Sequence, residues 1–238
     1  MKIALIGYGK MGHAIEEIAL QRGHEIVLKV GIENIEDNTI ENIQKADVAI
    51  EFTSPEIAFD NVIKCLDAGV PVVSGSTGWL QRFDEAKAYC TKKNGALLYA
   101  SNFSVGVNIF FAINKRLAEL IAPHSEYNVS LTEIHHTQKK DAPSGTAITL
   151  ADGILRYLRR KKTWVNHETN NPEELPIISE RIDPAPGTHS ITYTSDIDDI
   201  EIKHTAHNRK GFATGAVLAA EFLQNKKGIY SMSDVLGL

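Results

Sequence analysis

The stretch that most constrains the fold lies at the N-terminus, where a short apolar segment leads into a glycine loop and then a helical pattern. Lys2–Ile6 (KIALI) is typical of a buried strand, and apolar residues between Ile15 and Ala19 recur at helical spacing. Between them lies a complete G-x-G-x-x-G, made of Gly7, Tyr8, Gly9, Lys10, Met11 and Gly12. In a strand–loop–helix unit the first glycine permits a tight turn, the second admits a pyrophosphate, and the third lets the helix pack on the strand. The sequence therefore predicts a dinucleotide-binding loop, against the alternative of a glycine-rich turn without a ligand.

Strands and helices alternate through the first part of the chain, which predicts a parallel, doubly wound sheet. Further strands are predicted at Glu25–Val30, Ala46–Phe52, Pro71–Ser74 and Ala96–Ala100. Ligands of such sheets bind beyond the carboxyl ends of the strands. Small and polar residues at those ends are therefore predicted to contact the cofactor. They are Gly75, Ser76 and Thr77 after one strand, and Ala100, Ser101, Asn102 and Phe103 after another.

The end of the second predicted strand leaves the choice of cofactor open. An acidic residue normally follows this strand and binds the ribose hydroxyls, but Gly31 takes its place here. Glu33, two residues on, is the candidate for that role. Lys29 is a candidate for contact with a 2′-phosphate, and an ordinary solvated lysine is an equal alternative. We therefore expect NADH or NADPH without choosing between them.

The pattern changes after about residue 105. A helix is predicted over Gly106–Ile121, and later segments are mostly strands, at Ile177–Ile182, His189–Ser195 and Ile200–Thr205. Thr163–Pro176 is polar and is predicted to be an irregular loop, and a helix is predicted over Gly211–Gln224. The change predicts an α/β chain in which a Rossmann-type doubly wound sheet is joined to an α+β domain with an open mixed sheet.

The second informative stretch runs from Glu133 to Ala147 (EIHHTQKKDAPSGTA) and combines a strand end, a polar loop and a helix start. A helix N-terminus offers free backbone N–H groups and partial positive charge, so it favours an anion. The upstream lysines add full positive charge, and the two histidines can hold or release a proton near neutral pH. Together these residues predict a site that binds a carboxylate or phosphate and moves a proton. Isolated His-His or Lys-Lys pairs, by contrast, are usually structural or solvated.

The composition limits the functional classes. The 238 residues, 43% of them hydrophobic, suffice for one large domain or two smaller ones. A net charge of −5 argues against a nucleic-acid partner, and the basic run Arg159–Lys162 closes a predicted helix, where it complements the helix dipole. No apolar run reaches the length of a membrane span, and no signal-peptide pattern opens the chain. We expect a cytoplasmic protein without a membrane partner, and Cys65 and Cys90 suggest no disulfide framework.

A metal site built from Glu133, His135 and His136 is a weak alternative. Adjacent residues of a regular strand point to opposite faces, and no further ligand follows at a sensible spacing. We therefore expect no metal.

The run His135–Ala147 resembles a signature of the dihydrodipicolinate reductase (4-hydroxy-tetrahydrodipicolinate reductase) family, H-H-x-x-K-x-D-A-P-S-G-T-A. The similarity extends to the glycine loop, to Gly75–Gly78 (GSTG) and to Asn102–Asn108 (NFSVGVN), and spans nearly the whole chain. The chain departs from the family in its short length and in Gly31. The resemblance implies reduction of a cyclic dicarboxylate by NADH or NADPH in the diaminopimelate route to lysine.

The resemblance also implies a division of labour within the chain. Residues 1–102 and 210–238 would bind the dinucleotide, and residues 103–209 would bind substrate and form a homotetramer. It assigns His135 and Lys139 as the catalytic acid/base pair. The implied substrate contacts are His136, Gly145 and Thr146, to which the helix start adds Ser144. Arg209 is left as a clamp for a carboxylate or a loop cap. The alternatives are another two-domain dehydrogenase acting on a small amino or semialdehyde acid, and a non-catalytic NAD(P) sensor.

Overall fold

The structure is a computed structural model that describes residues 1–208 and 210–238. The chain divides into two compact units, and each is described by itself. Unit 1 comprises Met1–Val105 and Lys210–Leu238, and unit 2 comprises Gly106–Arg209. Arg209, for which the sequence suggests a carboxylate clamp or a loop cap, lies outside the described residues.

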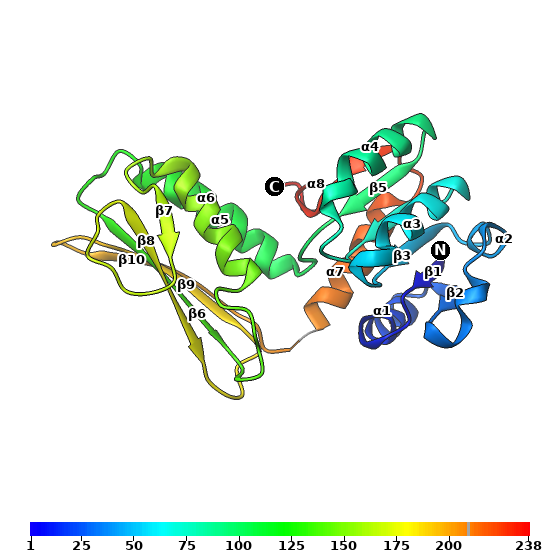
Figure 1. Ribbon diagram of the computed structural model, residues 1–238, viewed down its shortest axis with the longest axis horizontal. Helices are drawn as coiled ribbons and strands as arrows, with labels where there is room; N and C mark the ends of the chain where they lie inside the picture. Colours follow the sequence, from blue (N-terminus) through cyan, green and yellow to red (C-terminus); the bar gives the residue numbers. More distant parts are fainter. Residues whose placement is uncertain (209) are drawn as a thin grey trace. The chain divides into compact units, whose positions relative to one another are not determined.

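Unit 1 is built on a six-stranded parallel sheet in the order β11-β5-β4-β3-β1-β2 (Figure 1). The strands are β1 (Lys2–Ile6), β2 (Glu25–Val30), β3 (Val48–Glu51), β4 (Val72–Ser74), β5 (Ala96–Tyr99) and β11 (Gly228–Tyr230). The helices are α1 (Lys10–Gln21), α2 (Ile40–Ile43), α3 (Pro55–Asp67), α4 (Phe83–Lys92), α7 (Lys210–Leu223) and α8 (Met232–Leu236), with short 3-10 turns at Ile32–Asp37 and Leu80–Arg82. The sheet order reverses beside β1, so the glycine loop after β1 lies at the switch point where such sheets bind ligands.

Alternation along the strands of unit 1 explains its two apolar layers. On β1, Ile3 and Leu5 pack with α1, α7 and α8, whereas Ala4 and Ile6 pack with α3 and α4 on the other face. Because both faces are covered, the central strands β3 and β4 are apolar except for Glu51 and Ser74 at their carboxyl ends. The predicted doubly wound sheet is confirmed, and β11 and α8 add to it two C-terminal elements that the sequence patterns did not indicate.

Unit 2 is a five-stranded mixed sheet in the order β10-β9-β6-β8-β7, and α5 and α6 lie along one face of it (Figure 1). The elements are α5 (Val105–Ile121), β6 (Asn128–His135), α6 (Gly145–Tyr157), β7 (Thr163–Val165), β8 (Glu174–Arg181), β9 (Thr188–Thr194) and β10 (Asp199–Thr205). The mixed sheet predicted for this part of the chain is confirmed. The loop predicted over Thr163–Pro176 is wrong at both ends, because Thr163–Val165 pairs with the start of β8.

The helix-facing side of this sheet changes character along β6. Val129 and Leu131 are fully buried against the helices, and the next two residues on the same face are Glu133 and His135. Because side chains two apart on a strand share a face, the apolar core runs directly into a buried polar cluster at the carboxyl end of β6.

Candidate functional site

The three glycines of the N-terminal loop have different surroundings in unit 1. Gly7 has a φ of +101°, and a Cβ there would lie 2.0 Å from the Phe52 carbonyl oxygen. A Cβ on Gly12 would lie 2.6 Å from the Gly7 carbonyl oxygen, which marks close packing of α1 on the loop. At Gly9, by contrast, a Cβ would meet nothing within 4 Å. Gly9 therefore leaves the open approach that a dinucleotide pyrophosphate needs, while the other two glycines shape the turn.

Phe52, at the end of β3, connects the loops that the sequence predicts to hold the cofactor. Its ring lies where a side chain at Gly75 would go, because a Cβ at Gly75 would be 2.2 Å from the ring. The same ring lies 5.5 Å, centroid to centroid, from that of Phe103. With its carbonyl against Gly7, Phe52 brings the loops after β1, β4 and β5 to one edge of the sheet.

Glu51, which sequence reasoning missed, anchors the loops after β3 and β4. Its carboxylate is fully buried and accepts hydrogen bonds from Ser74 Oγ and Ser76 Oγ, both at 2.7 Å, and from the Thr53 backbone N–H at 2.9 Å. The Ser76 hydroxyl, predicted to contact cofactor, is thus directed into the protein. Thr77, beside it, is exposed.

The end of β2 holds a charged cluster next to the glycine loop. Lys29 Nζ lies 2.5 Å from Glu16 Oε1, the Tyr8 hydroxyl donates to the same carboxylate, and the Lys29 ammonium lies 5.2 Å from the Tyr8 ring centroid. The hydrogen bond with Glu16 raises the pKa of Lys29. The Gly31 backbone N–H is bound by Asn34 Oδ1 at 2.8 Å, and Glu33 is exposed. Lys29, the candidate for a 2′-phosphate, is therefore held by an acid on α1.

The remaining predicted cofactor residues flank this edge of the sheet. Lys10 and Ser101 are exposed, and Met11 is half-buried. Ala100 and Phe103 are buried, and Asn102 Oδ1 accepts a hydrogen bond from the Ser104 backbone N–H at 2.9 Å.

In unit 2, three strands place a row of polar side chains under the start of α6. The register puts Glu133 on β6 opposite Ser179 on β8 and opposite His189 on β9. One step along, His135 on β6 is opposite Arg181 on β8. Sequence reasoning missed Ser179, Arg181 and His189, since their proximity depends on which strands pair.

Glu133 is at the centre of this row and is fully buried. Its Oε1 accepts hydrogen bonds from Ser179 Oγ at 2.8 Å, Arg181 Nη2 at 3.0 Å and the Ser144 backbone N–H at 3.0 Å. Burial by itself would raise the pKa of Glu133, but contacts with these three residues and His135 hold that pKa well below its ordinary value. The carboxylate is thus a fixed anion that joins β6, β8 and α6.

Ser144 is the N-cap of α6 and faces the buried row. Its Oγ accepts from the Ala147 backbone N–H at 3.2 Å and lies 3.1 Å from His189 Nε2. Ser144 is 3% exposed, whereas Gly145 is exposed and a Cβ there would meet nothing within 4 Å. Of the predicted substrate contacts at the helix start, Gly145 and Thr146 are therefore the accessible ones, and the Ser144 hydroxyl is occupied as a cap.

His135 ends β6, and its ring is largely covered. Its Nδ1 lies 3.2 Å from Glu133 Oε2, and a Cβ on Gly187 would lie 3.1 Å from its Nε2. The ring centroid is 5.1 Å from that of His189. His136, just beyond the strand, is half-buried, and its carbonyl accepts from the Lys139 backbone N–H at 3.1 Å.

Lys139 lies in the loop between β6 and α6. Its ammonium donates to both oxygens of Asp141 at 2.8 Å. This hydrogen bond lowers the pKa of Asp141. The predicted acid/base pair, the helix start and the buried carboxylate thus lie within one part of unit 2.

Glu133, His135 and His189 also have the composition of a metal-ligand set. Their candidate ligand atoms all lie within 4.8 Å of one another. The metal set rejected from the sequence had His136 as its third residue. In the structure the third residue is His189 on β9 instead. The expected absence of a metal stays a prediction.

Both halves of the chain match family models. Residues 1–103 match the model described as dihydrodipicolinate reductase, N-terminus, and residues 106–236 match the model described as dihydrodipicolinate reductase, C-terminus. This chain belongs to the dihydrodipicolinate reductase family. The resemblance drawn from His135–Ala147 is thereby confirmed.

Members of the family align with nearly the full chain. The 4-hydroxy-tetrahydrodipicolinate reductase of Christiangramia forsetii is 50% identical over 99% of this chain and 98% of that protein. The 4-hydroxy-tetrahydrodipicolinate reductase of Methanosarcina acetivorans is 36% identical over 99% of this chain and 89% of that protein. A solved structure, the dipicolinate-bound dihydrodipicolinate reductase from Paenisporosarcina sp. TG-14, has a TM-score of 0.77 at 22% identity and covers 97% of both chains, which shows a shared fold.

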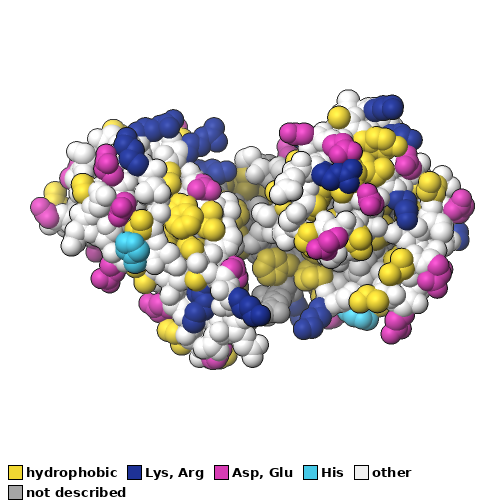
Figure 2. Space-filling model, in the orientation of Figure 1, with side chains coloured by type: hydrophobic (Ala, Val, Ile, Leu, Met, Phe, Trp, Pro, Cys, Tyr) yellow, Lys and Arg dark blue, Asp and Glu magenta, His cyan; other side chains and the backbone are white. Residues whose placement is uncertain are grey.

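The surface charges and the apolar character of the helices can be compared with what nucleic-acid and membrane partners require. Acidic and basic side chains are interspersed on the visible face of each unit, with apolar patches between them (Figure 2). Among the described residues, no helix combines the length and apolar character needed to cross a bilayer.

Proposed function

We propose that this chain is an NAD(P)H-dependent oxidoreductase that reduces 4-hydroxy-tetrahydrodipicolinate to tetrahydrodipicolinate in diaminopimelate and lysine biosynthesis. Its family membership and its 50% identical relative support the reaction. The site assignment depends on the position of the Glu133 carboxylate. It accepts a hydrogen bond from the backbone N–H of Ser144, the N-cap of α6, at 3.0 Å, and it lies 3.2 Å from His135 Nδ1. One buried anion therefore orients both an anion-binding helix start and a proton-transfer group.

Unit 1 would hold the dinucleotide. The open space at Gly9 fits a pyrophosphate, and the loops after β4 and β5, ordered by Glu51 and Phe52, would line the nicotinamide end. When bound, the reduced dinucleotide supplies the hydride. The residues of this chain would hold and orient it, and Lys29 with Glu16, beside Tyr8 of the glycine loop, would recognise the adenosine ribose of either cofactor.

Unit 2 would hold the cyclic dicarboxylate and supply the proton. Gly145 and Thr146 present the start of α6 to a carboxylate, and Lys139 adds an ammonium held by Asp141. Once the substrate has lost its hydroxyl group as water, hydride would reach one ring carbon, and His135, with His136 beside it, would transfer a proton to the neighbouring ring carbon. A positioned acid or base of this kind contributes on the order of 10²–10⁴-fold in rate.

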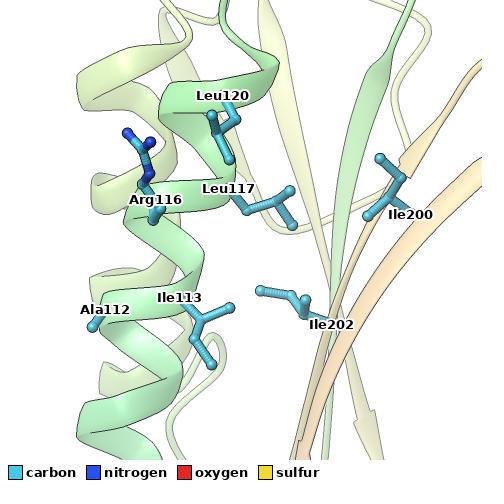
Figure 3. Close-up of a pocket in the computed structure, with 7 residues that line it drawn as sticks. All are labelled: Ala112, Ile113, Arg116, Leu117, Leu120, Ile200 and Ile202. Carbon is cyan, nitrogen blue, oxygen red and sulfur yellow. The ribbon is translucent and has the colours of Figure 1, made fainter.

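The finer proposals concern assembly and location. We propose a cytoplasmic homotetramer formed through unit 2. An apolar groove between α5 and β10 supports this, and Figure 3 shows Ile113 and Leu117 of α5 and Ile202 of β10 directed toward one another. It is lined by Ala112, Ile113, Arg116, Leu117, Leu120, Ile200 and Ile202. Beside it, β10 is an edge strand with unpaired backbone groups, a feature that favours pairing with another chain.

The test is consumption of NADH and of NADPH, followed by absorbance, with substrate generated by dihydrodipicolinate synthase. Oxidation that depends on the synthase product supports the function. Oxidation only with another amino or semialdehyde acid in a substrate panel would support a different dehydrogenase, and cofactor binding without oxidation of any substrate would support a sensor.

A further inference from the structure

The polar row beneath α6 contains groups that the proposed reaction does not yet use. Glu133 Oε2 and His135 Nδ1 are both buried, and within the described structure neither has a hydrogen-bond partner of good geometry. They are 3.2 Å apart. Two unsatisfied buried polar atoms at this separation are costly unless they share a proton, and catalytic hydrogen bonds are often poorly aligned before ligands bind.

We propose that Glu133 is a positioning residue that fixes the tautomer of His135. Its Oε2 accepts the Nδ1 proton of His135, so that Nε2 is the ring atom that exchanges a proton with the substrate. This inference rests on the proposed function. In general, a carboxylate that accepts the proton of one imidazole nitrogen fixes the tautomer and leaves the other nitrogen free to accept a proton.

The surroundings of the ring agree with this assignment. Gly187, one step beyond the end of the β6–β9 register, lies at the Nε2 edge, and any side chain there would be 3.1 Å from Nε2. A side chain at position 187 would therefore crowd the Nε2 edge, which glycine avoids. The Nδ1 edge, by contrast, faces the fully buried Glu133.

His189 completes the arrangement as a neutral acceptor. The Ser144 hydroxyl already accepts from Ala147, so its own proton is free to go to His189 Nε2 at 3.1 Å. That bond leaves no proton on the nitrogen of His189 that faces Glu133 Oε2 at 3.7 Å. Glu133 Oε2 is therefore left to His135 alone.

A divalent cation bound by the same three residues is the competing explanation. Electrostatics disfavour it, because the carboxylate of the set is already paired with the Arg181 guanidinium at 3.0 Å. The positive charge of Lys139 also acts on His189. A divalent cation would be repelled by these positive charges, and the only carboxylate of the three-residue set is already shared with Arg181.

The first test uses the full-length wild-type protein with ¹⁵N-labelled histidine at alkaline pH, where imidazoles are neutral. Long-range ¹H–¹⁵N correlations distinguish the Nδ1–H and Nε2–H tautomers, and the His135→Gln spectrum assigns the signal. We expect His135 in the Nδ1–H form. An Nε2–H form in the wild type overturns the proposal without reference to any variant or assay.

The second test is Glu133→Gln, whose amide would donate to Nδ1 and enforce the Nε2–H form. We expect kcat to fall on the order of 10²–10⁴-fold with KM values changed by less than about threefold. Glu133→Asp, which keeps the anion, should retain the Nδ1–H form and an intermediate kcat. Retention of the Nδ1–H form in Glu133→Gln, or a kcat near that of the wild type, contradicts the proposal.

Two controls separate the possible failures. Ser179→Ala removes a bond to Oε1 but leaves Oε2, so it should lower thermal stability and keep the Nδ1–H form. Loss of wild-type activity on chelation, restored by zinc, would replace the proposal with a metal site. If wild-type protein reduces no substrate, the proposed function fails, and the tautomer measurement still decides the position of the His135 proton.

Discussion

Lys139 Nζ donates to both carboxylate oxygens of Asp141 at 2.8 Å, two residues along the same loop. The two residues lie close together in the loop that leads into α6. The pair holds an ammonium in this loop, and the proposed substrate carries two carboxylates that such a charge could bind. The position of the Lys139 ammonium is therefore set by a local loop within unit 2.

Replacing Lys139 by Ala removes this ammonium. We expect kcat to fall on the order of 10²–10⁴-fold, because charge stabilisation and proton transfer are lost, while NADH binding to unit 1 is unchanged. Steady-state kinetics and cofactor fluorescence titration measure the two effects. Lys140→Ala, an exposed neighbour, is the matched control and should stay within a few fold of wild type. Near-normal turnover of the Lys139 variant would remove this residue from the mechanism.

Two alanine substitutions in the glycine loop should fail in different ways. Gly9→Ala has room for its methyl group, so the protein should fold normally but bind NADH and NADPH at least tenfold more weakly. Gly7→Ala places a Cβ 2.0 Å from the Phe52 carbonyl oxygen at a φ of +101°, so it should destabilise unit 1 itself. Thermal denaturation and cofactor titration distinguish the two. Wild-type cofactor affinity in Gly9→Ala would argue against a dinucleotide at this loop.

Glu16 is expected to set the balance between the two cofactors. Its carboxylate holds Lys29 at 2.5 Å, so Glu16→Gln should release a lysine for the 2′-phosphate. We expect the Kd for NADPH to fall severalfold relative to that for NADH, and Lys29→Ala to produce no such gain. Parallel fluorescence titrations at one ionic strength measure both values. An unchanged ratio in Glu16→Gln would mean that Lys29 does not reach the ribose.

Stability should depend on pH through His189. Burial, together with the neighbouring His135, lowers the pKa of His189 from its ordinary 6.5 to about 4. Because the folded-state pKa is depressed, the unfolded state binds the proton more readily, and stability is lost as pH falls from about 6.5 to about 4. The full effect of such a shift is about 3 kcal/mol.

The measurement is the free energy of unfolding by denaturant across this pH range. His189→Gln cannot take up the proton, so its stability should change less with pH than that of the wild type. His167→Gln replaces an exposed histidine and should follow the wild-type curve. Identical pH dependence in wild type and His189→Gln would show that His189 does not titrate in the fold.

The proposed tetramer can be tested with two exposed isoleucines. Ile113 on α5 is 47% exposed and lines the apolar groove, whereas Ile57 on α3 of unit 1 is 48% exposed. Light scattering on a size-exclusion column should give four times the chain mass for wild type and for Ile57→Glu. Ile113→Glu should shift the protein to smaller species, because a charge would be buried in the interface. A wild-type mass of one chain would exclude the assembly.

The fold was predictable where local patterns determine it. Lys2–Ile6 and the glycine loop predict their own strand, turn and helix, and Glu133–Ala147 predicts the strand end, loop and helix start that β6 and α6 form. The short strands β7 and β11, each of three residues, carry too little pattern to stand out from loops. Their formation depends on the neighbours they pair with.

The sequence motif of the candidate site was predictable, but the buried residues that hold the motif in place were not. His135 and Lys139 lie in one continuous run, whereas His189 reaches Glu133 only through the antiparallel register of β9 on β6. Glu51 likewise ends an apolar strand, and nothing in that strand indicates that two serines of the following strand and loop will donate to it. Contacts between residues distant in sequence depend on strand order, which local periodicity does not reveal.

Unit 1 is assembled from two separate stretches of chain, and α7 from the second stretch fills one apolar face of its sheet. During synthesis on the ribosome the first stretch emerges without the helix that covers Ile3, Leu5 and Ile50. The intervening stretch can complete its own sheet meanwhile, because its strands and helices are contiguous. The N-terminal portion of a nascent chain therefore keeps this apolar surface uncovered until α7 has been synthesised.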